Sequence, residues 1–130
     1  VPRAVAEALR VAAPVPATVR VAARDTTLGA RRVRAGTRLV VLTANLARDP
    51  ALFPDPDVFD ARRVHDPRAR HLWYGAGPHF CLGFAVAQRQ LRAAVEALLD
   101  APAPLAVVER RVARGVLLPG YARLVVRAGA

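Results

Sequence analysis

The sequence of 130 residues predicts an α+β chain in which helices and small sheets share one modest core. Three observations lead to this fold class. Apolar residues recur at helical spacing over residues 82–99, and residues 31–42 alternate on both sides of a turn. Two further strand-like segments, 105–109 and 121–127, lie near the end of the chain.

The first predicted helix covers residues 3–12. It ends before Pro14 and Pro16, because proline lacks the N–H group that a helix interior needs. Residues 18–22 then alternate like a strand. The N-terminal part of the chain therefore predicts one helix followed by one strand.

Residues 31–42 predict a β-hairpin whose turn is Ala35-Gly36. Residues 44–48 predict one short helical turn. The segment that follows, residues 49–63, contains three prolines, which disfavour helix and push the residues before them toward extended backbone. We therefore expect an irregular meander there.

The helix over residues 82–99 has the clearest pattern. Its apolar face is predicted to comprise Ala87, Leu91, Ala94, Val95, Leu98 and Leu99. Its opposite face is predicted to comprise Gln88, Arg89, Arg92 and Glu96. Beyond it, residues 116–120 predict an apolar turn between the last two strands, and from the residues alone we expect its tip to pack under neighbouring structure.

Cys81 is the only cysteine, and it lies between Gly77 and Gly83 just before this helix. The thiolate is the metal-binding form of cysteine, and a helix N-terminus favours it. The glycines would let a flat group approach and let backbone N–H groups point at the sulfur, which tunes a sulfur ligand. The competing interpretation is a small buried apolar residue, the commoner role of a lone cysteine.

Residues 74–83 resemble the haem-binding loop of the cytochrome P-450 family, whose pattern is Phe-x-x-Gly-x-x-x-Cys-x-Gly. Gly77, Cys81 and Gly83 match this pattern. Tyr74 departs from it, because it adds a hydroxyl where the family has phenylalanine. A buried phenol generally needs a hydrogen-bond partner, so this departure raises a structural question.

Two further motifs follow the order found in this family. Glu7 and Arg10 resemble its Glu-x-x-Arg pair, and residues 49–63 resemble its meander before the cysteine loop. The resemblance implies that Arg63 joins the pair in a structural triad, with Arg62 as the alternative. Without the resemblance, a Glu and an Arg three apart are helix-face neighbours worth only about 0.2–0.5 kcal/mol, and the two later arginines are ordinary surface charges.

The resemblance implies a haem b cofactor, an iron protoporphyrin, with Cys81 as its axial thiolate and catalytic ligand. Electron donation by the thiolate favours cleavage of the O–O bond. Arg20 and His79 match positions that contact the haem propionates; the alternatives are a surface pair for Arg20 and a water-facing loop residue for His79. The other implied site residues are the cofactor-binding Tyr74, Gly75, Gly77 and Gly83 and the substrate-lining Val116 and Leu117.

The implied complete fold is mainly α with small β-sheets, and residues 1–130 cover only its C-terminal third. We interpret the chain as the haem-binding part of a monooxygenase that inserts oxygen into a small organic substrate, using electrons from a ferredoxin or a flavoprotein reductase. The family's long helix over the distal haem face has no counterpart here, so we expect the piece to be inactive alone. The alternatives are a decayed, non-catalytic fragment and, with less support, a basic nucleic-acid-binding domain.

The formal net charge is +10, and every basic residue other than histidine is arginine. These arginines are scattered and carry no nucleic-acid motif, so we expect no nucleic-acid partner. They reflect either coding bias or a docking face for an acidic redox partner. No apolar run reaches the ~18 residues that cross a bilayer, so we expect no membrane segment in this chain. A single cysteine fits a cytoplasmic location.

Overall fold

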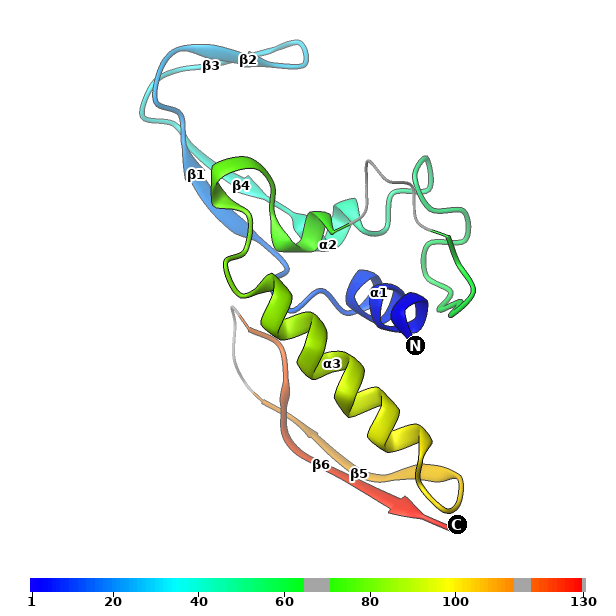
Figure 1. Cartoon of the computed structure of the whole chain (residues 1–130). Coiled ribbons are helices and arrows are strands. Elements are labelled where there is room, and N and C mark those ends of the chain that lie inside the picture. The colour runs from blue at the N-terminus through cyan, green and yellow to red at the C-terminus, as the bar shows by residue number, and fades with distance from the viewer. Residues whose placement is uncertain (65–70, 114–117, 130) are drawn as a thin grey trace.

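The computed structural model describes residues 1–64, 71–113 and 118–129 of the chain. In chain order, these residues form α1 (Pro2–Val11), β1 (Thr18–Val21), β2 (Thr26–Leu28), β3 (Arg31–Val33), β4 (Arg38–Val41), α2 (Thr43–Leu46), the 3-10 turns η1 (Leu72–Tyr74) and η2 (Gly77–His79), α3 (Phe84–Leu99), β5 (Leu105–Val112) and β6 (Tyr121–Ala128). The predicted mixture of helices and small sheets is confirmed (Figure 1).

Helix α1 forms where the sequence predicts it. Pro2 occupies its first turn, where the missing N–H group would have had no helical partner. The chain leaves the helix at Ala12, whose N–H still donates to the carbonyl oxygen of Ala8 at 2.9 Å. The short helix α2 and the strands β1, β5 and β6 likewise form in or beside their predicted segments.

The predicted hairpin over residues 31–42 is wrong in its pairing. Strand β3 pairs with β2, a strand that the sequence pattern did not predict, whereas β4 pairs antiparallel with β1. Gly29, at φ +57°, lies in the short connection between β2 and β3. The Gly36 turn instead returns the chain to β1, because its N–H donates to the carbonyl oxygen of Ala22 at 2.8 Å. The β2–β3 hairpin therefore projects from the end of the β1–β4 ladder (Figure 1).

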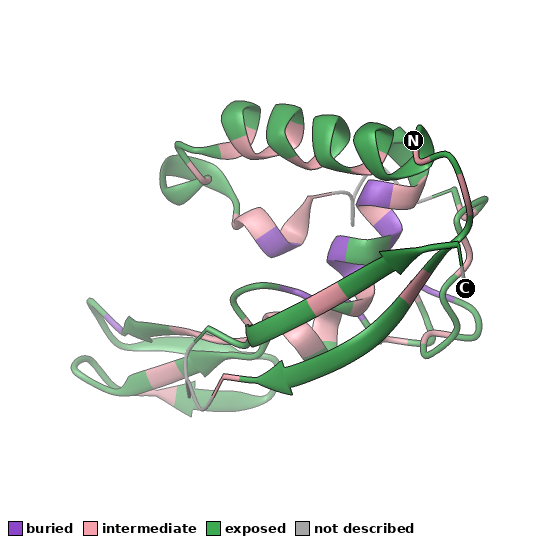
Figure 2. Ribbon diagram, turned by 90° about the horizontal axis from the view of Figure 1, so that it is seen from below, coloured by how far each residue is buried: buried purple, intermediate pink, exposed green. Residues whose placement is uncertain are grey.

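The described core lies around α1. Buried apolar side chains from α1, the segment after it and η1 form one cluster: Val5, Leu9, Ala13 and Trp73. Half-buried Tyr74, Leu91 and Val95 pack against this cluster, and the last two come from α3. Buried positions gather on and near α1, while the sheets are largely exposed (Figure 2).

Helix α3 begins at Phe84, two residues later than predicted, with Gly83 as its N-cap. Its half-buried positions are Phe84, Ala87, Gln88, Leu91 and Val95. The prediction that Gln88 belongs to the outward face is therefore wrong, and the predicted apolar residues Ala94, Leu98 and Leu99 are exposed in this chain. The inward face follows the partners that α3 finds at α1 and η1.

The last sheet consists of β5 and β6, which pair antiparallel with two irregularities in register. The predicted substrate-lining residues Val116 and Leu117 lie outside the described residues. Within the part of the chain that the structure describes, no helix combines the length and the apolar character needed to cross a membrane.

Candidate functional site

Glu7 and Arg10 form a fully buried ion pair on the side of α1 that faces the meander; their exposed fractions are 0% and 1%. Arg10 donates from Nε to Glu7 Oε2 at 2.9 Å and from Nη2 to Glu7 Oε1 at 2.8 Å. It also donates to the carbonyl oxygens of Ala47, Pro56 and Val58. A guanidinium has five N–H donors, and these five bonds use all of them.

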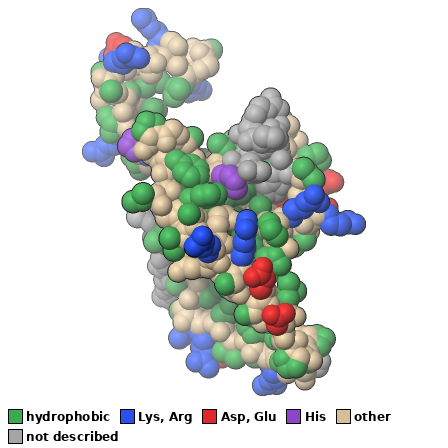
Figure 3. Space-filling model, in the orientation of Figure 1, with side chains coloured by type: hydrophobic (Ala, Val, Ile, Leu, Met, Phe, Trp, Pro, Cys, Tyr) green, Lys and Arg blue, Asp and Glu red, His purple; other side chains and the backbone are tan. Residues whose placement is uncertain are grey.

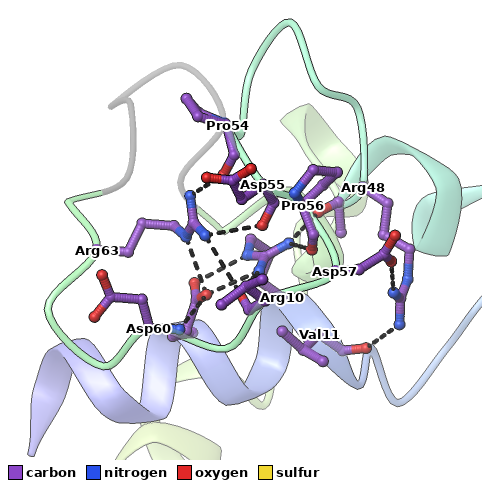
Figure 4. A network of polar contacts seen from close by, with 12 residues as sticks. Arg10, Val11, Arg48, Pro54, Asp55, Pro56, Asp57, Asp60 and Arg63 are labelled. Carbon is purple, nitrogen blue, oxygen red and sulfur yellow. Dashed lines mark hydrogen bonds and ion pairs between the residues drawn. The ribbon is translucent and has the colours of Figure 1, made fainter.

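Arg63 also reaches Glu7, with its Nε 3.0 Å from Oε1, whereas Arg62 pairs with Asp60 instead. The N–H of Asp60 donates to the same Glu7 oxygen at 3.1 Å. The structure therefore brings together Glu7, Arg10 and Arg63, the three residues that the family resemblance implied as a triad, and not the alternative Arg62. Figure 4 shows the meander folded over α1, with both guanidinium groups pointing inward.

Contacts around this network tie the meander to other elements. The guanidinium of Arg10 lies over the ring of Phe53, 5.2 Å from its centroid, in a cation–π arrangement. Arg48 bridges the carboxylate of Asp57 and the carbonyl oxygen of Val11 (Figure 4). One face of α1 is thus fixed by charge to the meander, while its apolar face packs on Trp73, next to the cysteine loop.

The cysteine loop is closed by backbone geometry. The N–H of Cys81 donates to the carbonyl oxygen of Tyr74 at 2.9 Å. Gly75 and Gly77 have φ of +80° and +63°, a region that other residues rarely adopt. A Cβ on Gly75 would also lie only 3.2 Å from the carbonyl oxygen of His79. The glycines therefore permit a tight turn that presents Cys81 in front of α3.

Cys81 is half-buried, and its sulfur lies 3.8 Å from the position that a Cβ on Gly83 would take. The N–H of Phe84 donates to the carbonyl oxygen of Cys81. Among the described residues, no N–H group donates to the sulfur, so the expected hydrogen bonds to Sγ are not formed here. Next to the thiol, the side chain of Leu82 is fully exposed, at 101%.

Aromatic rings join this loop to the start of α3. The ring of Phe84 contacts those of His71, Tyr74 and Phe80, with centroids 4.9, 5.0 and 5.2 Å away. Gln88, one turn further along α3, donates from Nε2 to the hydroxyl oxygen of Tyr74 at 3.2 Å. This partner was missed in the sequence, although a tyrosine in place of phenylalanine was the signal that one was needed.

The other two predicted cofactor contacts are exposed. His79 ends the turn η2, and Arg20 lies on β1 with its Nη1 bonded to the carbonyl oxygen of Val19 at 2.9 Å. The described contacts bring neither side chain to Cys81. Both therefore present free or weakly held polar groups at the surface.

The donor set at Cys81 can be compared with the needs of a metal. No group of three or more His, Cys, Asp or Glu side chains suited to a metal ion occurs among residues 1–64, 71–113 and 118–129. A macrocycle brings most of the ligands itself, so one soft thiolate is sufficient for its metal. The exposed apolar Phe80 and Leu82, which flank Cys81 in the chain, would suit a flat organic group beside the sulfur. The residues present therefore fit a metal-carrying macrocycle.

One carboxyl in the meander has a clearly perturbed acidity. The backbone N–H of Arg62 and then its guanidinium donate hydrogen bonds to Asp60, and these bonds lower the pKa of the Asp60 carboxyl. Asp60 therefore stays ionised beside the triad at neutral pH.

Comparisons with known proteins agree on one family. A family model described as Cytochrome P-450 matches residues 1–101. Nocardicin C N-oxygenase of Nocardia uniformis subsp. tsuyamanensis is 41% identical over 104 residues, which cover 76% of this chain and 25% of that protein. The biotin biosynthesis cytochrome P-450 of Bacillus subtilis is 38% identical over 97 residues, covering 75% of this chain and 24% of that protein.

Solved structures give the same result. The crystal structure of a thermophilic cytochrome P-450 from Sulfolobus tokodaii superposes with a TM-score of 0.87 at 34% identity, covering 98% of this chain and 34% of that one. The chain spans about a quarter of the length of the curated relatives that it matches.

Proposed function

This chain belongs to the cytochrome P-450 family, and we propose that its residues 1–130 are the C-terminal, haem-binding part of a haem-thiolate monooxygenase. The observation that carries the proposal is the half-buried thiol of Cys81, presented by a glycine loop in front of α3. The bonded set of Glu7, Arg10 and Arg63 supports it, because it ties the meander to α1, whose apolar face packs on Trp73 next to that loop.

In this proposal Cys81 is the axial ligand of haem b and the one catalytic residue of the chain. Gly75, Gly77 and Gly83 keep side chains away from the cofactor, and Tyr74 closes the loop through its carbonyl oxygen. Arg20 and His79 bind the haem propionates, since a cation or a donor stabilises a carboxylate. Arg20 would exchange its bond to a backbone oxygen for this stronger, charge-assisted one.

When bound, a thiolate-ligated haem supplies the oxygen activation that protein side chains cannot provide. The proposed reaction inserts one oxygen atom into a small organic substrate and releases the other as water. It consumes two protons and two electrons, and a ferredoxin or a flavoprotein reductase delivers the electrons. The chain's own residues hold the sulfur in place. The rings of Tyr74, Phe80 and Phe84 exclude water between the loop and the start of α3.

The other details belong to the same proposal. Val116 and Leu117 line the substrate cavity of the complete protein, and the free thiol of Cys81 fits a cytoplasmic location. The exposed arginines of this chain suit an acidic redox partner, and arginines lie among apolar side chains on the face in Figure 3.

The test is Cys81→Ser in the complete polypeptide that carries these residues, assayed by the carbon monoxide difference spectrum of the reduced protein. We expect the wild-type spectrum to contain the band typical of thiolate ligation, and the serine variant to lose it. His79→Gln is the control: it should weaken haem retention and leave the band position unchanged. A band that stays in place in the serine variant would remove the basis for the proposal.

The 130-residue chain by itself is proposed to be inactive. Leu82, the residue after Cys81, is fully exposed, so the described residues leave the chain next to the thiol open to water. We expect the purified 130-residue chain to give no stable thiolate-type band with haem and carbon monoxide. A persistent band would show that this piece is sufficient for ligation.

A further inference from the structure

Tyr74 begins the cysteine loop and carries the hydroxyl that departs from the family pattern. In the structure its side chain is half-buried, and Gln88 of α3 donates a hydrogen bond to its oxygen at 3.2 Å. An oxygen that lost its partner in such a site would be costly, so this bond accounts for the tolerance of a tyrosine here.

The spacing on α3 explains how one side chain reaches two partners. Phe84 and Gln88 are four residues apart, so they lie on the same helix face one turn apart. The ring of Tyr74 meets that of Phe84 edge-on, at 5.0 Å and 89°. Its hydroxyl then reaches Gln88 in the next turn. Tyr74 is therefore held against α3 both at its ring and at its tip.

The backbone of Tyr74 holds the cysteine. Its carbonyl oxygen accepts the N–H of Cys81 at 2.9 Å, while its own N–H donates to the carbonyl oxygen of His71 at 2.8 Å. A short path thus runs from the amide of Gln88, through the side chain and backbone of Tyr74, to the residue that carries the sulfur.

We propose that Gln88 is a positioning residue for Cys81. Its hydrogen bond fixes Tyr74 against the second turn of α3, and the fixed carbonyl of Tyr74 limits opening of the loop at Cys81. Gln88 does not contact the sulfur, so it acts only through Tyr74. The importance of this role for catalysis rests on the proposed function, whereas the hydrogen-bonded path itself does not.

The test is Gln88→Met, which keeps an unbranched side chain of similar length and helix propensity but cannot donate to the phenol. The readout is amide hydrogen exchange at Cys81 in the complete polypeptide, with and without haem. A neutral hydrogen bond of ordinary strength corresponds to about a fivefold change in an opening equilibrium. We expect the Cys81 amide to exchange about fivefold faster in the variant.

Two matched variants separate this effect from a general change in α3. Gln90→Met makes the same substitution at an exposed site of the same helix, and exchange at Cys81 should not change. Gln88→Glu can still bond to the phenol, as an acceptor of its O–H, and should restore slow exchange. Equal acceleration by Gln90→Met, or none by Gln88→Met, would overturn the proposal.

A double variant tests the route through Tyr74. Tyr74→Phe removes the same hydrogen bond from its other end, so we expect a similar acceleration while haem binding is retained. In that background Gln88→Met should add nothing. An undiminished effect of Gln88→Met on top of Tyr74→Phe would refute the path. If Gln88→Met does not fold, slow exchange in Tyr74→Phe alone is sufficient to reject it.

The proposed function has a separate readout. Absence of a thiolate-type carbon monoxide band in the wild-type polypeptide refutes Cys81 as haem ligand, and exchange in the haem-free protein still decides the role of Gln88. A normal band combined with unchanged exchange in Gln88→Met refutes only the role of Gln88.

Discussion

Replacement of Glu7 by glutamine tests the buried ion network directly. The substitution keeps the shape of the side chain but removes its charge. It also places an NH₂ group or a neutral oxygen where the carboxylate now accepts from Arg10 Nε and Nη2, at 2.9 and 2.8 Å. Arg10 is 1% exposed, so its guanidinium would stay charged in a site that water does not reach.

The magnitude follows from what the carboxylate does. Glu7 accepts two bonds from Arg10, one from Arg63 and one from the N–H of Asp60. Breaking a buried pair from one side costs about 3–5 kcal/mol, because a buried charge loses its compensation. The side chain of Arg63 is 14% exposed and still partly hydrated. The loss of its ion pair with Glu7 therefore adds little to this cost. We expect Glu7→Gln to lower the free energy of unfolding by about 3–5 kcal/mol.

The assay is equilibrium urea unfolding of the complete polypeptide, followed by tryptophan fluorescence. Trp73, the only tryptophan of these 130 residues, contributes to this signal and packs against α1. Glu96→Gln is the matched control: Glu96 is exposed on α3, and its loss should change stability by about 0.5 kcal/mol or less. A cost for Glu7→Gln no larger than that for Glu96→Gln would show that the network does not brace α1.

Three other substitutions probe neighbouring features. Arg10→Lys offers three donors in place of five, so the free energy of unfolding measured in urea should fall by about 2–4 kcal/mol. Arg62→Lys, at an exposed site, is its control and should have little effect. Gly75→Ala places a side chain at φ +80° and close to a carbonyl oxygen, so unfolding should become easier by about 1–2 kcal/mol; Gly120→Ala, which meets open space, is its control. Because the pKa of Asp60 is lowered, its ionised carboxylate stabilises the folded protein above about pH 4, the ordinary pKa range of an aspartate. This stabilisation is lost as pH falls through the lowered pKa. Asp60→Asn should therefore destabilise the protein at pH 7 but not in strong acid, and a difference that is constant with pH would contradict the assignment.

Much of the local structure was predictable. The helix that became α1 and the helix that became α3 follow from apolar spacing and from the prolines and glycines that bound them. The cysteine loop was recognisable because its glycines and Cys81 are contiguous, and close backbone turns depend on residues only a few positions apart. The family assignment from these motifs agrees with the comparisons.

Strand pairing was not predictable in the same way. The segment 31–42 contains two strands and a glycine turn, which is the pattern of a hairpin. Strands β2 and β3 have only three residues each, too few to reveal alternation, and Gly29 offered a second turn that competes with Gly36. Strand β4 pairs with the edge of β1, and this pairing depends on the rest of the fold.

The sequence alone identified the chemical groups: one cysteine between glycines, a glutamate and an arginine on one helix face, and a tyrosine where a phenylalanine was expected. The choice of partners was decided only by tertiary structure. Folding of the meander over α1 selects Arg63 rather than Arg62 for Glu7, and the packing of α3 turns Gln88 inward to meet Tyr74. Backbone preferences act over a few residues, whereas a hydrogen bond needs two groups within about 3 Å, and only packing brings distant segments that close.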